Sequence, residues 1–171
     1  MTSEFADWVK KYQILQANCW QYPNHIPEGT LYDGVMGTVG DGWISILDAL
    51  ATRLIALGWD RKLLQVREKF GVLHFYPESG WTHKMQAAIE EAIGLSAKTC
   101  EDCGEPGIAQ EGDWTRTLCD ACQVRRGGQL PLPWTRLGGS ELRRDQGFGI
   151  GVVDTVTYEI TRMYSDYFAN E

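Results

Sequence analysis

Apolar side chains recur at helical spacing in two stretches near the start of the chain. In residues 4–15 they lie three and four positions apart, and Ser3 precedes them in the position of a helix N-cap. In residues 43–57 leucine and isoleucine repeat in the same way, between Asp41 as a candidate cap and Gly58 as a candidate end. Both stretches therefore predict amphipathic helices with one buried face.

The pattern then changes from helical to alternating. Residues 62–76 predict a β-hairpin that turns at residues 68–71, in the letters EKFG. The alternating positions of its two arms are Leu64, Val66, Val72, His74 and Tyr76. A third helical stretch follows over residues 81–92, and Gly94 either ends that helix or weakens it.

Turn-forming residues dominate two other segments. Residues 20–42 are rich in glycine, which predicts exposure and makes the aromatic residues there candidate partner-binding residues: Trp20, Tyr22 and Tyr32. Residues 123–151 are rich in glycine, proline and arginine and predict an irregular arm. Residues 154–167 then predict a last helix, although the β-branched residues 153–157 fit a strand as well.

Four cysteines form two closely spaced pairs, Cys100 with Cys103 and Cys119 with Cys122. The spacing C-x2-C-x15-C-x2-C is typical of a zinc ribbon, in which each pair makes a tight turn that aims two thiolates at one metal ion. Four thiolates fill a tetrahedral coordination shell and leave no position open for water or substrate. The pattern therefore predicts one structural Zn²⁺ ion rather than a catalytic one.

The surroundings of these cysteines favour metal binding over disulfide bonds. Gly104 follows the first pair, where a residue that adopts positive φ suits the turn, and residues 108–110 and 114–118 are short strand candidates. The chain has five cysteines, an odd number, and enough apolar residues for a core of its own, which argues against a disulfide framework. The fifth, Cys19, is expected to be a small packed side chain; a nucleophile assisted by His25 is the alternative.

Charge is spread unevenly along the chain, whose formal net charge is −7. Residues 99–122 hold six acidic side chains and one basic one, and a zinc ion with four thiolates adds a formal charge of about −2. Such a module suits a basic protein surface better than nucleic acid. The arginine-rich stretch that follows adds four candidate partner-binding residues: Arg125, Arg126, Trp134 and Arg136. Either its arginines contact a partner, or they neutralise the acidic module within the same molecule.

Motifs of catalysis and of membrane insertion are absent from the sequence. Residues 37–42 begin like a phosphate-binding loop, but Trp43 stands where such a loop needs lysine, and residues 147–151 lack the dinucleotide-binding spacing. The zinc-hydrolase, deaminase and serine-hydrolase motifs do not occur. The sequence contains no run of about 18 apolar residues, which a membrane span requires, and the first residues do not resemble a signal peptide. We therefore expect a non-enzymatic protein of the cytoplasm with no membrane contact.

Several motifs occur here in a specific combination: Gly42-Trp43 at the start of a helix, QVREKFG at 65–71, LHFY at 73–76, TCEDCGEPG at 99–107 and WTRTLC at 114–119. In this combination residues 42–122 resemble a group of uncharacterised proteins from bacterial and bacteriophage genomes. The last metal ligand in that group is often His, whereas Cys122 stands here, and Gly and Arg often replace Val72 and His74. The resemblance implies a helix–hairpin–helix core with a cysteine module and a bacterial or phage origin, and it implies no activity.

Together these patterns predict an α+β fold in three parts. A small helical and hairpin core spans residues 1–98, a four-cysteine zinc ribbon is attached over 99–122, and an arm with a C-terminal helix packs back on the core over 123–171. The favoured function is a non-enzymatic, zinc-stabilised protein-binding protein, an inhibitor or modulator that a phage or mobile element directs at a bacterial host machine such as a defence complex. The alternative is a zinc ribbon that binds nucleic acid through residues 125–144.

Overall fold

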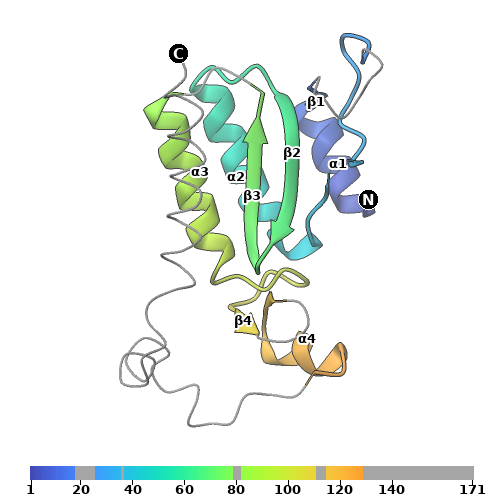
Figure 1. Ribbon diagram of the computed structural model, residues 1–171, viewed down its shortest axis with the longest axis vertical. Coiled ribbons are helices and arrows are strands. Elements are labelled where there is room, and N and C mark those ends of the chain that lie inside the picture. Colours follow the sequence, from blue (N-terminus) through green and yellow to red (C-terminus); the bar gives the residue numbers. More distant parts are fainter. Residues whose placement is uncertain (18–25, 36, 79–81, 111–114, 129–171) are drawn as a thin grey trace. The chain divides into compact units, whose positions relative to one another are not determined.

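The structure is a computed structural model (Figure 1), and it describes residues 1–17, 26–35, 37–78, 82–110 and 115–128. The chain divides into two compact units, residues 1–128 and residues 129–171. The second unit lies outside the described residues, and with it most of the predicted arm and the whole predicted C-terminal helix. The described part has the α+β composition that the sequence predicts, with helices, a three-stranded sheet and a two-stranded sheet. None of its helices is long and apolar enough to cross a bilayer.

The larger sheet contains the predicted hairpin. Strands β2 (Lys62–Lys69) and β3 (Val72–Pro77) pair antiparallel, and β1 (Leu15–Gln16) adds a short parallel strand to the other edge of β2. The turn consists of Phe70 and Gly71 alone and is shorter than predicted. Both residues have positive φ, 56° and 77°, as a type I′ turn requires, and this turn geometry matches the twist of the two strands.

A register shift in β2 changes which residues of the hairpin are buried. Leu63 pairs with Pro77 and Gln65 with Tyr76, so Leu64 is an extra residue on β2. The extra residue reverses the alternation, and Leu63 is fully buried while Leu64 is half-buried, contrary to the predicted alternation. On β3 the fully buried apolar residues are Leu73 and Phe75 rather than Val72 and Tyr76, and His74 of the predicted set is also buried.

The first helix, α1 (Ser3–Tyr12), ends three residues earlier than predicted. Gln13 adopts the left-handed conformation with φ 51°, and the chain then enters β1. The N-cap is Thr2 rather than Ser3: the Thr2 hydroxyl accepts the backbone N–H three residues further on, at 3.3 Å. A capping bond of this kind is worth about 1 kcal/mol.

The second and third helices follow the predicted periodicity. A short 3₁₀ turn, η1 (Asp41–Trp43), leads into α2 (Ile44–Ala56), so the candidate cap Asp41 lies in this turn and Trp43 occupies the N-cap. Gly58, with φ 96°, follows the end of α2 as predicted. The third helix, α3 (His83–Ser96), continues through Gly94, so this glycine does not end it.

One hydrophobic core lies between the three helices and one face of the larger sheet. In Figure 1 α2 passes behind β2 and β3, with α3 and α1 on either side of the strands, and the buried side chains of the helices belong to the same cluster as those of the strands. The largest fully buried members are Phe5, Trp8, Ile14, Tyr32, Trp43, Leu47, Leu54, Leu63, Leu73 and Phe75. Each such side chain contributes about 1.5–3 kcal/mol of burial free energy.

Tyr32 belongs to this core, and its prediction as an exposed partner-binding residue is wrong. Its side chain is 1% exposed. The hydroxyl accepts the backbone N–H of Val66 at 3.3 Å and donates to the carbonyl oxygen of Gly37 at 2.9 Å. Because β1 pairs with only two residues of β2, the Tyr32 hydroxyl satisfies a backbone group further along the same edge.

Candidate metal centre

The first cysteine pair lies in a tight turn directly after α3. Gly104 has φ 80°, and its N–H donates to the carbonyl oxygen of Cys100 at 3.0 Å. This bond closes the turn and brings Cys103 back beside Cys100. Glycine adopts positive φ without the steric cost that a Cβ atom adds, which confirms the predicted role of Gly104.

The second pair lies where a small hairpin runs into a short helix. Strands β4 (Ile108–Gln110) and β5 (Arg116–Leu118) pair antiparallel, in agreement with the two predicted strands. Helix α4 (Asp120–Arg125) begins at once, with Cys119 as its N-cap and Cys122 in its first turn. The helical turn places the two thiols on the same side. We call residues 99–128 the metal module.

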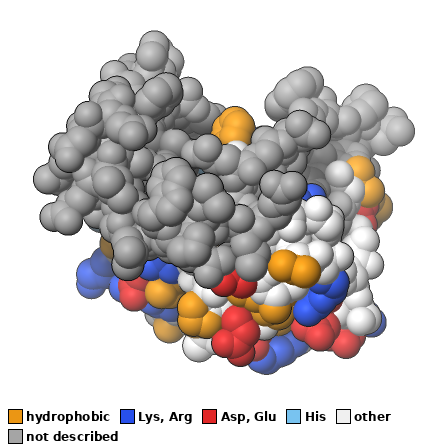
Figure 2. Space-filling view, turned by 90° about the horizontal axis from the view of Figure 1, so that it is seen from below, with side chains coloured by type: hydrophobic (Ala, Val, Ile, Leu, Met, Phe, Trp, Pro, Cys, Tyr) orange, Lys and Arg blue, Asp and Glu red, His pale blue; other side chains and the backbone are white. Residues whose placement is uncertain are grey.

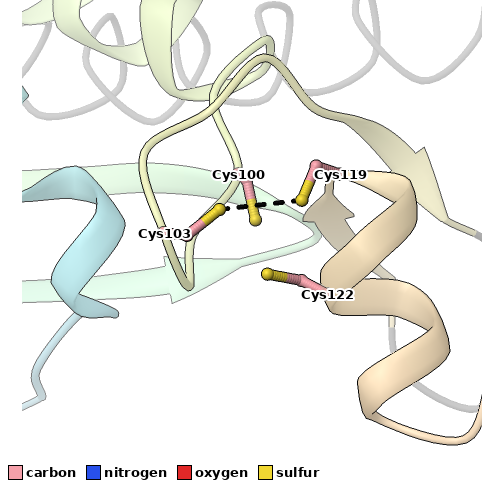
Figure 3. Close-up of side chains that lie close together, drawn as sticks. All are labelled: Cys100, Cys103, Cys119 and Cys122. Carbon is pink, nitrogen blue, oxygen red and sulfur yellow. Dashed lines mark hydrogen bonds between the residues drawn. The ribbon is translucent and has the colours of Figure 1, made fainter.

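The four thiol groups converge on one point, as Figure 3 shows. All four Sγ atoms lie within 4.8 Å of one another, and those of Cys103 and Cys119 are 3.6 Å apart. Sulfur atoms that hold zinc at about 2.3 Å on the corners of a tetrahedron are about 3.8 Å apart. The four cysteines can therefore hold a metal ion with little movement, and all four corners are protein atoms.

The two ends of this cluster differ in burial, and its individual thiols differ in acidity. Cys100 and Cys122 are 0% exposed, whereas Cys103 is exposed and Cys119 is partly exposed. A hydrogen bond from the backbone of Cys122 lowers the pKa of Cys119 to about 7, while burial and the neighbouring thiols raise the pKa of Cys122. Four thiolates this close repel one another, and a divalent cation at their centre removes that repulsion.

Charged side chains around the first turn are paired within the module. Glu101 is 2% exposed, and its carboxylate pairs with Arg116 and with Arg126. Arg126 also makes a two-pronged contact with Asp102, with Nε donating to Oδ2 at 2.7 Å. Burial raises the pKa of Glu101 against the opposing effect of Arg116, whereas Arg126 lowers the pKa of Asp102. For Arg126 this arrangement favours the prediction that the arginines after the cysteines neutralise the acidic module within the molecule.

The metal module also contacts the core through two glycines, Gly40 just before η1 and Gly42 within it. The N–H of Gly42 donates to the carbonyl oxygen of Glu101 at 2.9 Å. A Cβ atom on Gly42 would lie 2.2 Å from the carbonyl oxygen of Cys100, and one on Gly40 would lie 2.1 Å from that of Glu101. Sequence reasoning read this segment as a turn and missed the contact, for which the two closely spaced glycines were the available signal.

The hairpin of the larger sheet provides a second contact. The Thr117 hydroxyl donates to the carbonyl oxygen of Gly71 at 2.6 Å, and the N–H of Glu101 donates to the carbonyl oxygen of Thr117 at 2.9 Å. The hairpin turn, β5 and the first cysteine turn are thus linked by consecutive hydrogen bonds. This arrangement fixes the orientation of the first cysteine pair.

The other predicted partner-binding residues fall into two groups. Arg125 and Arg126 are exposed at the end of α4, although the guanidinium of Arg126 is already engaged with Asp102. The rest lie outside the described residues: Trp20, Tyr22, Trp134 and Arg136. Cys19, the fifth cysteine, lies outside them as well. A role of these residues in partner binding stays a prediction.

Comparison of the chain with protein-family models, with curated proteins and with solved structures finds no match.

Proposed function

We propose that this chain is a non-enzymatic, zinc-stabilised binding protein whose partner is another protein with a basic surface. The observation that carries the proposal is the closed set of four sulfur atoms, two of them fully buried, held against the core. In such a set the metal ion has no coordination position for water or substrate, so it stabilises the fold. Zinc is the expected ion, because four cysteines in two C-x-x-C turns are typical of structural zinc sites.

Exposed apolar side chains support a protein partner. Four exposed apolar side chains of the described part lie on the metal module or on an element next to it. Ile108 and Val124 belong to the module, Leu95 to α3, which precedes it, and Phe70 to the hairpin turn that contacts it. Figure 2 views the molecule from the end that carries the module, and on its described surface hydrophobic side chains lie among acidic and basic ones. Apolar anchors surrounded by charged residues are typical of protein-binding surfaces.

Phe70 is the strongest candidate anchor. It is 52% exposed at the tip of the hairpin and has a φ of 56°, a conformation that costs a bulky residue about 1–2 kcal/mol. Asn is the residue that such a turn position prefers. An exposed aromatic side chain held at an energetic cost, next to the metal module, is typical of a binding residue.

Charge supports a basic partner. The metal module has six acidic side chains and three basic ones, and the four thiolates with zinc add a formal charge of about −2. An excess of negative charge speeds encounter with a positively charged surface and opposes binding of acidic competitors. The resemblance of residues 42–122 to bacterial and phage proteins suggests a bacterial host machine, such as a defence complex, as the place to look for the partner.

Metal analysis of the purified full chain tests the first half of the proposal. We expect one zinc ion per chain, and a Co²⁺-substituted protein whose absorption spectrum is that of four thiolate ligands and does not change when exogenous ligands are added. A preparation without zinc, or a cobalt spectrum that responds to added ligand, would contradict a structural zinc centre.

Partner capture with matched baits tests the second half. The full chain, the variant Phe70→Asn and the control Val35→Ser are immobilised; Val35 is 73% exposed in the segment before η1. We expect a stoichiometric partner on the full chain and on the control but not on Phe70→Asn, and reconstitution with the purified partner at 1:1. Equal capture by all three baits would contradict Phe70 as an anchor, and steeply salt-dependent binding to DNA or RNA instead would favour the alternative function.

A further inference from the structure

Each cysteine turn provides one buried and one accessible thiol. In the first turn Cys100 is 0% exposed and Cys103 is exposed; in the second, Cys122 is 0% exposed and Cys119 is partly exposed. The cluster therefore has an inner pair that solvent does not reach and an outer pair that it does. Reagents in solution meet the outer pair first.

The outer pair is also close enough to react with itself. The Sγ atoms of Cys103 and Cys119 are 3.6 Å apart, as the dashed line in Figure 3 shows. A disulfide bond holds two sulfur atoms at about 2.05 Å, so the pair has to close by about 1.5 Å. Cys103 lies in an exposed turn, and Cys119 is the N-cap of a six-residue helix.

We propose that Cys103 and Cys119 form a modification site for two-electron oxidants of the peroxide class, at which oxidation creates a disulfide bond and releases the metal ion. The inference rests on the metal centre of the proposed function and adds a chemistry to it. The buried pair, Cys100 and Cys122, takes no part in the first oxidation.

The reaction balances with hydrogen peroxide as the oxidant. The Cys103 thiolate attacks the O–O bond, forms a sulfenic acid and expels hydroxide. The Cys119 thiolate then attacks that sulfur, forms the S–S bond and expels a second hydroxide. The two sulfur atoms give up two electrons, the peroxide is reduced, and two protons from solvent convert the hydroxides to water. Only the Cys100 and Cys122 thiolates would then remain as ligands, and because two thiolates bind a metal ion more weakly than four, they would release it.

The test uses the zinc-loaded full chain with Cys19→Ser, which removes the fifth cysteine. Hydrogen peroxide is added, zinc release is followed with a coloured chelator, and remaining thiols are blocked with N-ethylmaleimide before digestion. Trypsin cleaves after Lys98, Arg116 and Arg125, so the two cysteine turns fall on different peptides. A disulfide between the turns joins these peptides, and fragmentation of the joined species identifies the two sulfur atoms.

We expect the Cys103–Cys119 pair as the first disulfide, one zinc ion released per disulfide, and recovery of bound zinc after a thiol reductant and Zn²⁺ are added. A first disulfide that includes Cys100 or Cys122, or zinc release without joined peptides, overturns the inference. A starting preparation that carries no zinc overturns the metal centre itself, so the two failures are distinguishable.

Two serine variants provide a matched comparison, because each retains three of the four thiols. Cys103→Ser should slow peroxide-dependent formation of joined peptides by about tenfold, whereas Cys122→Ser should retain the Cys103–Cys119 product. Equal rates in the two variants would contradict the assignment. If either variant fails to fold, the disulfide mapping on the chain with all four ligands decides the question alone.

Discussion

The indole N–H of Trp43 donates to the carbonyl oxygen of Thr99 at 2.7 Å. Trp43 is 0% exposed at the start of α2, and Thr99 directly precedes the first metal ligand. This bond joins the centre of the hydrophobic core to the metal module, and the Gly42–Glu101 bond lies beside it. Loss of the metal ion should therefore destabilise the hydrophobic core as well as the metal module.

Chelation of the metal ion is expected to destabilise the whole described fold. A ligand present at about 1,000 times its dissociation constant stabilises the native state by about 4 kcal/mol. Structural zinc binds tightly enough for its stabilisation of the native state to reach at least this value. Thermal unfolding with and without EDTA measures the effect, with helix circular dichroism and tryptophan fluorescence as two probes. Both transitions should shift to lower temperature together; a helix transition that stays in place would show that module and core unfold independently.

Gly42→Ala should be strongly destabilising and should weaken metal binding. The added Cβ would lie 2.2 Å from the carbonyl oxygen of Cys100 and 2.7 Å from the N–H nitrogen of Cys103, both of them backbone atoms that cannot move without opening the turn. We expect a loss of about 2–4 kcal/mol in the free energy of unfolding, measured by urea denaturation.

Gly94→Ala is the matched control for this substitution. Gly94 lies within α3, and a Cβ atom there meets nothing within 4 Å. Alanine in a helix interior is more stable than glycine by about 0.5–1 kcal/mol, so this variant should unfold at higher urea concentration than the wild type. Destabilisation by both substitutions to a similar extent would contradict the close approach of the metal module to Gly42.

Phe70→Asn should raise stability, in addition to the loss of partner binding proposed above. Asn adopts positive φ at lower cost than Phe, and the turn retains Gly71 at its second position. The loss of the contact between the Lys69 ammonium and the Phe70 ring, 5.1 Å from its centroid, offsets part of the gain. We expect a net increase of about 0.5–1 kcal/mol in urea denaturation; a decrease would show that Phe70 serves the fold rather than a partner.

Local patterns predicted the parts of this molecule that are determined locally. The helices follow from apolar spacing, the hairpin from alternation, and the four-cysteine cluster from two C-x-x-C turns, each of which is a short-range arrangement. The glycine-rich composition around Tyr32 predicted an exposed loop. Whether such a loop packs over the edge of a strand depends on residues far away in the sequence, here Val66. In the same way, one extra residue at Leu64 reversed the expected burial, and no neighbouring residue signals it.

The close approach at the metal module is also long-range. Gly42 and Cys100 are far apart in sequence. Only the folded structure shows that the backbone of Cys100 leaves no room for a side chain at position 42. The glycines were visible in the sequence, whereas the backbone they contact was not. The cluster of four cysteines could therefore be predicted from the sequence, but its attachment to the core could not.

His74 should make the protein less stable in mild acid. Burial, together with the positive charges of Lys69 and Arg67, lowers its pKa from 6.5 to about 4. Its Nδ1 shares a hydrogen bond with the hydroxyl of Tyr76 at 2.9 Å. Below pH 6.5 the unfolded chain takes up a proton at this histidine that the folded chain does not, so acid favours unfolding.

The stability that neutral His74 contributes is complete above pH 6.5 and is lost as the pH falls towards about 4. One pKa unit corresponds to about 1.4 kcal/mol, and because partial solvent contact reduces the effect we expect a loss of about 1–2 kcal/mol across this range. Urea denaturation between these pH values should show a smaller decline for His74→Gln than for the wild type. Both proteins retain the four cysteines, so acid release of the metal ion affects them equally. His83→Gln, at an exposed histidine of α3, is the matched control and should decline like the wild type; identical profiles for all three proteins would contradict a buried, neutral His74.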